Sequence, residues 1–372
     1  MYKLKKIFLC FGTRPEAIKM APLYHELKKS SFEIKVCVTA QHRQMLDQVL
    51  DFFEIVPDYD LDLMQPNQTL NGLSAKILST VGEVLKLEKP DLVLVHGDTT
   101  TSSMVALAAF HLGIKVGHVE AGLRTYNKQA PFPEEINRQI TSRIADFHFT
   151  PTQQATQNLL NEGISSEYIA QTGNSVIDAL LWTINKIEKE HYSHPEIEQL
   201  KSIIPTNKKI ILVTGHRREN FGQGMKNLCE ALLNIAERDD VTIVYPVHLN
   251  PNIKDIVHEL LLAKKNIQLI NPMSYPAFVW LMQQSFLIVT DSGGIQEEAP
   301  SLGKPVLVTR AVSERPEGVT AGFSTLVGTD PSKIINTIQD ILDNFTSFKN
   351  PVNPYGNGTA SQQIVDYLLK HY

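Results

Sequence analysis

The chain has 372 residues, of which 42% are hydrophobic and 20% charged, and its formal net charge is −5. That length is about two and a half times the commonest domain length, and the apolar content is too high for a disordered chain. A weakly negative chain also lacks the overall positive charge of a general nucleic-acid-binding protein. We therefore expect two folded domains and no nucleic acid as a partner.

The cysteines and the N-terminal residues indicate the compartment. Cys10, Cys37 and Cys229 form no CxxC pair, so we expect buried, reduced thiols. The apolar run at residues 7–11 is too short for a signal peptide, and no run approaches the roughly 18 apolar residues of a membrane-spanning helix. These features predict a cytoplasmic protein with no membrane partner.

Short apolar runs alternate with helix-period segments in the first half of the chain, which is typical of βαβ units around a parallel sheet. The expected strands are residues 6–12, 34–39, 91–96, 116–119 and 147–150. The expected helices are residues 15–29, 44–53, 70–87 and 103–112, with a further helix after the two prolines at 131 and 133.

The pattern changes to a long amphipathic helix at residues 171–189 and a polar segment at 191–209. Alternation then restarts, with expected strands at residues 210–214, 242–247, 267–270, 287–290 and 305–309. We therefore expect an α/β protein with two Rossmann-like, doubly wound domains that face each other across a cleft. The expected division is an N-terminal domain at residues 1–172, a linker region at 173–207, a C-terminal domain at 208–358, and a helix at 359–372 that packs back toward the N-terminal domain.

The turn after the first expected strand has the composition of an anion-binding site. Residues 12–16 read Gly-Thr-Arg-Pro-Glu, and Pro15 suits the first turn of the helix that follows. Backbone N–H groups at a helix start attract anions, and Arg14 and Lys19 add positive charge. Because neither a Walker A loop nor a GxGxxG fingerprint is present, this pocket is predicted from local chemistry alone.

Carboxylates follow the next strands of the first half. Asp98 and Glu120 each follow an expected strand, and Glu134 and Glu135 occupy the first turn of a helix. The structural alternative for Asp98 is that it caps the N-terminus of the next helix. For the two glutamates the alternative is compensation of the helix dipole, which explains one of them but not both. Ligands bind beyond the carboxyl ends of parallel strands, so these groups are expected to converge for acid–base chemistry. His118 and Glu120 have the His-x-Glu form of zinc deaminases, but the chain has no Pro-Cys-x-x-Cys, so no metal is expected.

The second half predicts a nucleotide site. A cationic turn with His216 follows one expected strand, and Ser292, Gly293 and Gly294 follow another. Glycines let backbone N–H groups approach a phosphate at a helix start, and Glu298 lies one turn further on, where acidic residues bind a ribose diol. The residues predict a nucleoside diphosphate beside a carboxylate-rich half. They leave the reaction open, because a glycosyltransferase would present the same features.

Eight blocks, in order along nearly the whole chain, closely resemble the bacterial non-hydrolysing UDP-N-acetylglucosamine 2-epimerases. The blocks are GTRPEAIKMAPL, TAQHRQMLDQVL, VHGDTTT, GHVEAGLRT, PFPEEINR, VTGHRREN, VYPVHLNP and TDSGGIQEEAPSLGKPVLVTR. The resemblance implies a GT-B-like fold, a homodimer, and an isomerase that needs neither a redox cofactor nor a metal. It also implies reversible conversion of UDP-N-acetylglucosamine (UDP-GlcNAc) to UDP-N-acetylmannosamine (UDP-ManNAc), which supplies ManNAc for bacterial surface polysaccharide.

In the family, the C2 proton of the sugar is removed as UDP leaves C1, and UDP adds back to the 2-acetamidoglucal intermediate. Matching the blocks residue by residue implies catalytic positions at Asp98, Glu120, Glu134 and His216. Asp98 and Glu134 are the candidates for proton transfer at C2, and Glu120 is the candidate for holding the sugar or stabilising developing charge. The order in which the carboxylates act stays open at this stage.

The same matching implies further contacts with substrate or UDP, at Arg14, Lys19, Phe278, Ser292, Gly293, Gly294, Glu298 and Arg315. Some family members bind UDP-GlcNAc as an allosteric activator, and the residues that match those implicated there are Gln41, Gln44, Arg217 and His248. Asn67 or Gln68 stands where those members carry Arg, which leaves the activation open.

Three other functions compete with this interpretation. A retaining glycosyltransferase of the same fold would need an acceptor and would not require three carboxylates in the N-terminal half. A hydrolysing epimerase would release free ManNAc and UDP, and it is often joined to a kinase domain that this chain lacks. An inactive nucleotide-sugar sensor would not need the four catalytic positions, all of which are filled.

Overall fold

The computed structural model describes residues 5–39, 43–64, 68–189, 192–215, 217, 220–349 and 351–371. The chain forms two compact units: unit 1 comprises Met1–Leu181 and Tyr355–Tyr372, and unit 2 comprises Trp182–Pro354. The first passage between them lies within helix α7 (Ser175–Lys189). The region expected as a linker, residues 173–207, thus contains α7 and also helix α8 (Pro195–Ile203).

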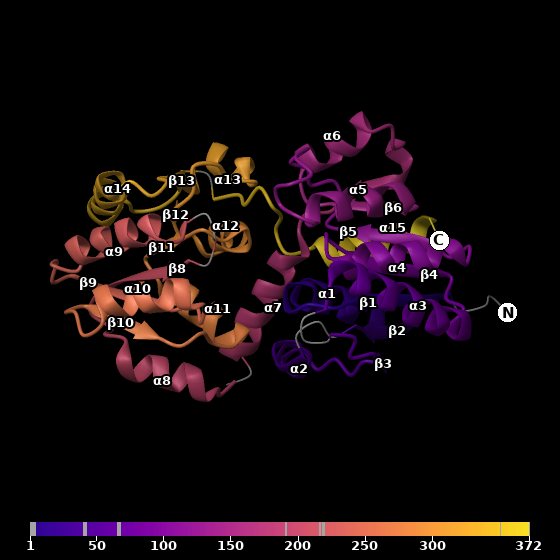
Figure 1. Ribbon diagram of the computed structural model, residues 1–372, viewed down its shortest axis with the longest axis horizontal. Helices are drawn as coiled ribbons and strands as arrows, with labels where there is room; N and C mark the ends of the chain where they lie inside the picture. The colour runs from indigo at the N-terminus through magenta and orange to yellow at the C-terminus, as the bar shows by residue number, and fades with distance from the viewer. Residues whose placement is uncertain are drawn as a thin grey trace. The chain divides into compact units, whose positions relative to one another are not determined.

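Within the described residues, unit 1 is built on a seven-stranded parallel sheet of order β3-β2-β1-β4-β5-β6-β7 (Figure 1). Its strands are β1 (Lys6–Phe11), β2 (Glu33–Val38), β3 (Tyr59–Asp60), β4 (Leu92–His96), β5 (Lys115–Val119), β6 (Phe147–Thr150) and β7 (Ile169–Gln171). The five expected strands are confirmed. The sequence analysis missed β3 and β7, because two or three residues are too few to show a period.

The expected long helix at residues 171–189 is wrong at its start. Residue 171 ends β7, and α7 begins only at Ser175. Between them Gly173 has a φ of +86°, a conformation that favours glycine and cannot continue a right-handed helix. This break sets Asn174 just beyond the carboxyl end of β7.

Helices cover both faces of the unit 1 sheet (Figure 1). They are α1 (Arg14–Lys28), α2 (Arg43–Phe52), α3 (Leu70–Glu88), α4 (Thr100–His111), α5 (Glu134–Ile144), α6 (Gln153–Asn161) and α15 (Ala360–His371). Apolar side chains of α3 and α4 pack in one core with Phe8 and Val93 of the sheet. Burying this apolar surface against the strands is the main stabilising term.

The C-terminal helix predicted from the sequence is confirmed as α15, and it is anchored in unit 1. Asp178 accepts hydrogen bonds from the N–H groups of Ala360 at 3.2 Å and Ser361 at 2.8 Å. The ring of Tyr367 lies edge-on to Phe149, with centroids 5.6 Å apart.

Unit 2 has a six-stranded parallel sheet, among the described residues, of order β10-β9-β8-β11-β12-β13. Its strands are β8 (Lys209–Thr214), β9 (Val241–Pro246), β10 (Ile267–Ile270), β11 (Leu287–Thr290), β12 (Val306–Val308) and β13 (Ser324–Leu326). Its helices beyond α8 are α9 (Gln223–Ile235), α10 (Pro251–Leu261), α11 (Tyr275–Gln284), α12 (Gly293–Glu298), α13 (Pro316–Thr320) and α14 (Pro331–Asn344). The five expected strands are confirmed, and the three-residue β13 was missed for the reason given for β7.

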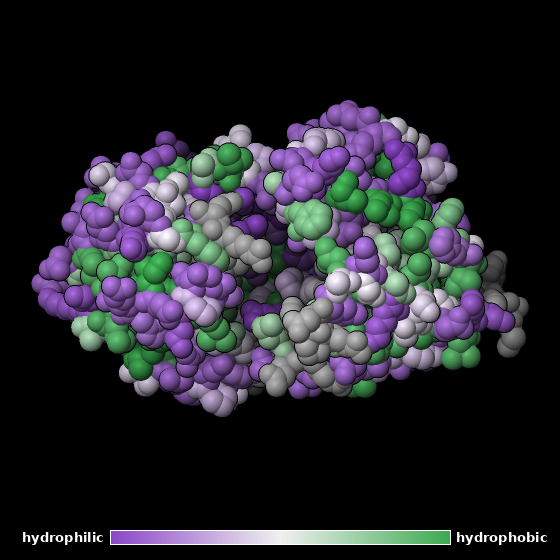
Figure 2. Space-filling model, in the orientation of Figure 1, coloured by the Kyte–Doolittle hydropathy of each residue, from purple (hydrophilic) through white to green (hydrophobic). Residues whose placement is uncertain are grey.

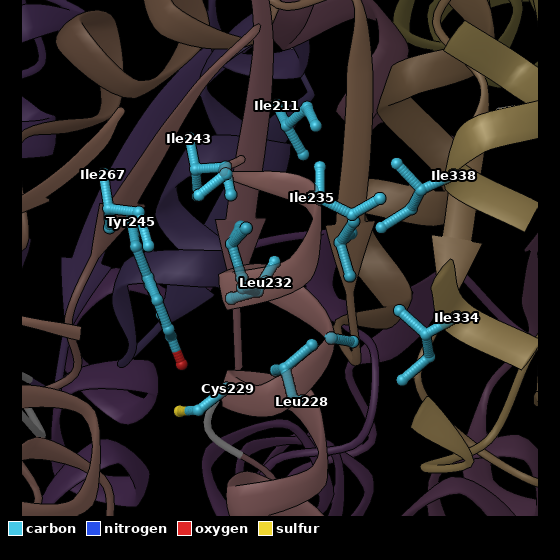
Figure 3. Close-up of a cluster of buried hydrophobic side chains, with 14 of the residues drawn as sticks. Ile211, Leu228, Cys229, Leu232, Ile235, Ile243, Tyr245, Ile267, Ile334 and Ile338 are labelled. Atoms are coloured by element: carbon cyan, nitrogen blue, oxygen red, sulfur yellow. The ribbon is translucent and has the colours of Figure 1, made fainter. Parts of the chain in front are cut away.

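The core on one face of the unit 2 sheet joins strands to α9, α10 and α14. Figure 3 shows Leu232 and Ile235 of α9 close to Ile211 and Ile243 of the strands, with Ile338 of α14 beside them. Such close packing fixes where the strand ends lie, and the turns beyond those ends carry the candidate site.

The surface carries polar and apolar side chains side by side, as Figure 2 shows for one face. In the part of the chain that the structure describes, no helix combines the length and the apolar character needed to cross a membrane. Cys10, Cys37 and Cys229 are free and buried, as predicted.

The strand order determines where each unit can bind a ligand. Both sheets reverse their order between two central strands, β1 and β4 in unit 1 and β8 and β11 in unit 2. In doubly wound sheets the crevice at that reversal, beyond the carboxyl ends, is where ligands bind. The turns after these four strands are therefore the places to look for chemistry.

Candidate functional site

The turn after β1 is held by Glu16, which is only 2% exposed. Its Oε2 accepts hydrogen bonds from the N–H groups of Gly12 at 3.0 Å and Thr13 at 2.8 Å, and Thr13 is the N-cap of α1. Gly12 is needed because a Cβ there would lie 2.2 Å from Oγ1 of Thr39. The turn thus presents Arg14 at the start of α1. The spacing Thr-x-x-Glu is a capping-box pattern, a signal from which this role of Glu16 was readable but was missed.

Asp98 lies in the turn after β4, and α5 holds it. The Arg138 guanidinium contacts its carboxylate through Nη2 at 2.7 Å and Nε at 3.0 Å. The Asn137 side chain donates to its backbone oxygen at 2.9 Å. The alternative that Asp98 caps α4 is wrong, because Thr99 is the N-cap and accepts from Ser102 N–H at 3.0 Å. The Asp98 side chain keeps 26% exposure, so it can meet a ligand.

Glu120 follows β5 with a φ of +62°, in the left-handed region that non-glycine residues rarely adopt. Its carboxylate forms an ion pair with Lys19 of α1 and accepts a hydrogen bond from Asn174 Nδ2 at 2.8 Å. His96 Nε2 lies 3.8 Å away. Backbone strain of this kind persists where the surroundings enforce it, and it clusters at functional sites. Sequence reasoning found Glu120 and Lys19, but it missed Asn174 and His96.

The structure distinguishes the two glutamates at the start of α5. Burial alone would raise the pKa of Glu135, but N–H donors of Thr125 and Tyr126 and the amide of Gln139 keep that pKa below its ordinary value. Glu135 is thus occupied in holding the preceding loop. In Glu134, by contrast, Oε2 is buried and has no hydrogen-bond partner among the described residues. Of the two glutamates, Glu134 is thus the one with a carboxylate oxygen that no described group occupies.

Two buried histidines stand beside these groups in neutral form. Burial lowers the pKa of His96 to about 4 and that of His118 to about 3. One ring nitrogen of His118, Nε2, lies 2.7 Å from the backbone oxygen of Gly97, which supports the turn that carries Asp98. A neutral imidazole at His96 adds no positive charge beside Glu120 and Asp98 at neutral pH.

In unit 2 a single carboxylate ties the two central turns together. Asp291 Oδ2 accepts from the N–H of Arg217 at 2.9 Å and from Asn220 Nδ2 at 3.2 Å. The hydroxyls of Thr214 and Thr290, at the ends of β8 and β11, lie 2.7 Å apart. This network fixes the backbone just before the glycine turn at Ser292.

The glycine turn meets an arginine. A Cβ added at Gly293 would lie 3.8 Å from Cζ of Arg315, so the guanidinium stands beside the first residue of α12. Arg315 is held by Glu297 at 2.5 Å. Glu298, the next residue, is 6% exposed and accepts from the hydroxyl of Tyr275 at 3.1 Å.

Two of the remaining candidate residues, Phe278 and His248, lie in unit 2. Phe278 is partly buried on α11, one turn after Tyr275. His248 follows β9, and its Nδ1 accepts from Asn250 N–H at 3.1 Å. His216, Gln41 and the side chain of Gln44 lie outside the described residues. Among the residues that are described, no group of three or more His, Cys, Asp or Glu side chains is arranged to hold a metal ion.

Two doubly wound α/β units, with charged and polar side chains in the turns after their strands, define a protein of the GT-B-like fold class, as predicted. A model of the family described as UDP-N-acetylglucosamine 2-epimerase matches residues 25–369. The chain belongs to this family, which confirms the resemblance seen in the sequence.

Known relatives match this chain over nearly their full length. The UDP-N-acetylglucosamine 2-epimerase of Escherichia coli (strain K12) is 53% identical over 368 residues, 98% of each chain. The UDP-GlcNAc 2-epimerase of Neisseria meningitidis, solved bound to UDP-GlcNAc, has a TM-score of 0.91 at 50% identity and covers 98% of this chain and 100% of its own. The enzyme of Methanocaldococcus jannaschii, solved with UDP-GlcNAc and UDP, has a TM-score of 0.83 at 35% identity, over 98% and 99% of the two chains.

Proposed function

We propose that this protein interconverts UDP-GlcNAc and UDP-ManNAc by inverting C2 of the sugar without hydrolysis. The observation that carries the proposal is full-length identity of about half to relatives named as UDP-N-acetylglucosamine 2-epimerases. The proposed place of the product is the supply of ManNAc for bacterial surface polysaccharide.

The proposed chemistry in unit 1 is an elimination followed by an addition. A C2 hydrogen beside an acetamido group is only weakly acidic, so its removal must accompany cleavage of the C1–O bond. The C2 proton passes to one carboxylate, the C2–H electrons form the C1=C2 bond of 2-acetamidoglucal, and the C1–O electrons leave with UDP. In the reverse addition the C1=C2 electrons take a proton from a second carboxylate on the other face of C2, and an oxygen of UDP forms the C1–O bond again. This sequence needs no redox cofactor.

Asp98 and Glu134 are the proposed proton-transfer groups. Arg138 holds the first in place, and the second has a buried oxygen with no hydrogen-bond partner in the described part of the chain. Glu120, paired with Lys19, is the proposed group that holds the sugar or stabilises charge as C1–O breaks. Arg14 is the proposed contact at the anionic end of the ligand.

Unit 2 is the proposed binder of UDP. The backbone N–H groups of Ser292, Gly293 and Gly294, with the guanidinium of Arg315, suit the diphosphate. Glu298 suits the ribose diol, and Phe278 the uracil ring. His216 is proposed as a catalytic group on the strength of the family blocks alone.

Activation by a second UDP-GlcNAc molecule is a separate part of the proposal, with Gln41, Gln44, Arg217 and His248 as its candidates. Activation predicts a sigmoidal dependence of the initial rate on UDP-GlcNAc concentration, and Arg217→Ala should make it hyperbolic. Hyperbolic kinetics of the natural chain would remove this part and leave the epimerase proposal unaffected.

A homodimer in the cytoplasm completes the proposal. Nucleotide sugars are made from nucleoside triphosphates inside cells, and buried free thiols suit a reducing compartment. Light scattering should give twice the chain mass of 41.7 kDa. A mass equal to one chain would contradict the dimer.

Proton NMR of the purified protein with UDP-GlcNAc in D2O tests the reaction. We expect UDP-ManNAc to grow to equilibrium with deuterium at C2 and UDP still attached. Release of free ManNAc would identify the hydrolysing reaction instead. An unchanged spectrum would favour a glycosyltransferase or another UDP-sugar.

A further inference from the structure

Glu16 contacts two turns of unit 1 that are far apart in sequence. Its Oε2 accepts from the N–H groups of Gly12 and Thr13 in the turn after β1. Its Oε1 accepts from the hydroxyl of Thr99, in the turn after β4, at 2.7 Å. The carboxyl group is buried, so these donors take the place of water.

The two turns that share this carboxylate flank the point where the strand order reverses. The first presents Arg14 at the start of α1, and the second carries Asp98 immediately before Thr99. Thr99 also caps α4 by accepting from Ser102 N–H, so its hydroxyl donates to Glu16 while it accepts from the helix. These two hydrogen bonds together fix the orientation of the Thr99 hydroxyl.

We propose that Glu16 is a positioning residue for the epimerase reaction: its ionised carboxylate holds the Arg14 turn and the Asp98 turn in the relative placement that catalysis needs. This inference rests on the proposed function. Glu16 acts through the backbone of these turns, and it is not itself a proton donor to the sugar.

Charge matters because the groups that hydrogen-bond to the carboxylate oxygens, two backbone N–H groups and the Thr99 hydroxyl, are all donors. Burial raises the pKa of Glu16 to about 7, while hydrogen bonds from Thr99, Thr13 and Gly12 act in the opposite direction. A protonated Glu16 cannot accept equally at both oxygens, because one of them then carries a hydrogen. Loss of its charge near neutral pH therefore loosens at least one of the two turns.

The ionisable groups around Glu16 come from several elements. On β1 the thiol of Cys10 has its pKa raised, first by its neighbour Cys37 and in small part by Glu16. Arg14 and Lys19 share α1 with Glu16, and Asp98 adjoins Thr99. The acid limb of the pH profile is the loss of kcat as the pH falls. This loss is assigned to Glu16 only if substitutions at Glu16 and at Thr99 change it.

The test is the pH profile of kcat for UDP-GlcNAc epimerisation in Glu16→Gln, which keeps the shape and removes the titration. We expect the natural chain to lose activity as the pH falls through about 7, and Glu16→Gln to lack that limb with kcat lowered at least tenfold at pH 8.5. Thr99→Val removes a hydrogen bond that lowers the pKa of Glu16, so the loss of kcat in this variant should begin at higher pH. Thr99→Ser, which keeps the hydroxyl, should return the limb to its original position. Glu83→Gln, an exposed glutamate on α3, is the matched control and should leave the profile unchanged.

Amide NMR separates this inference from the proposed function. The backbone signals of Gly12, Thr13 and Thr99 should titrate with one midpoint near pH 7 in the natural chain and should be flat in Glu16→Gln. If the natural chain has no turnover but these signals titrate together, the function is wrong and the coupling of the turns stands. If the natural chain turns over and Glu16→Gln keeps its kcat and its acid limb, the inference is overturned. Amide signals that do not titrate overturn it in either case.

Discussion

Glu120 shows how a single residue can be held in an unfavourable conformation by its neighbours. Its positive φ costs about 1–3 kcal/mol for a residue with a Cβ. The ion pair with Lys19 and the hydrogen bond from Asn174 fix the carboxylate that this backbone presents. The same position filled by glycine would relieve the strain and lose the carboxylate.

Removing the charge of either Glu120 or Asp98 should lower kcat strongly without weakening the binding of UDP. For Glu120→Gln and Asp98→Asn we expect kcat to fall by about 10²- to 10⁴-fold, because a positioned acid–base or charge-stabilising group is lost. UDP affinity, measured by calorimetry, should stay within a few-fold, since the proposed nucleotide contacts lie in unit 2. Turnover equal to that of the natural chain in both variants would remove the proposed mechanism.

Asn174 tests whether the orientation of Glu120 matters. Asn174→Ala removes the Nδ2 donor at 2.8 Å and also the acceptor that Val176 N–H uses at 3.0 Å. A buried carboxylate that loses one donor is destabilised by about 1–3 kcal/mol, so kcat should fall by about tenfold or more. Asn161→Ala, at an exposed position, serves as the control. A kcat unchanged in Asn174→Ala would show that the Asn174 donor is not needed to orient Glu120.

At the scale of elements, the turn after β1 tolerates no side chain at its first residue. Gly12→Ala would place a Cβ 2.2 Å from Oγ1 of Thr39 and 2.6 Å from Oγ1 of Thr101, two hydroxyls that lie 2.9 Å apart. Overpacking of this kind costs about 1–3 kcal/mol of unfolding free energy. Gly82→Ala on α3 meets nothing within 4 Å and should stabilise by up to about 1 kcal/mol. Urea unfolding checks both, and equal stability of the two variants would contradict the steric argument.

Element prediction from sequence worked where a segment was long enough to show a period. Ten expected strands and the C-terminal helix are present, because buried parallel strands are continuous apolar runs. The helix at 171–189 was placed too early, since Gly173 breaks it, and β3, β7 and β13 were missed. Edge strands of two or three residues are defined by their hydrogen-bond partners, and no local pattern shows those.

At the scale of the whole molecule, acid should weaken unit 1 through its buried histidines. Burial lowers the pKa of His96, His118 and His148 to about 4, 3 and 4, below the ordinary value of 6.5. A depressed folded-state pKa contributes stability above pH 6.5 that is lost as the pH falls toward 4, because the unfolded chain takes up protons first. Glu16, whose pKa burial raises to about 7, and Asp178, whose pKa burial also raises, act in the opposite direction.

Hydrogen exchange followed by mass spectrometry can read each unit separately. Between pH 6.5 and 4.5, protection of β4, β5 and β6, corrected for the intrinsic exchange rate, should fall more than that of β8 and β11. His148→Gln should reduce the pH dependence, and His111→Gln, at an exposed position, should not. Equal loss of protection in both units would contradict this assignment.

The sequence by itself determined that the chain forms two parallel α/β sheets and which turns carry charged groups, because periodicity and turn residues are local properties. Only the tertiary structure decided that Glu134 rather than Glu135 keeps an oxygen without a partner among the residues described. It alone showed that Thr99 reaches Glu16 across 83 positions of sequence and that Asn174 reaches Glu120 across 54. Contacts of that length depend on which strands lie side by side, and strand order is set by the packing of the whole sheet.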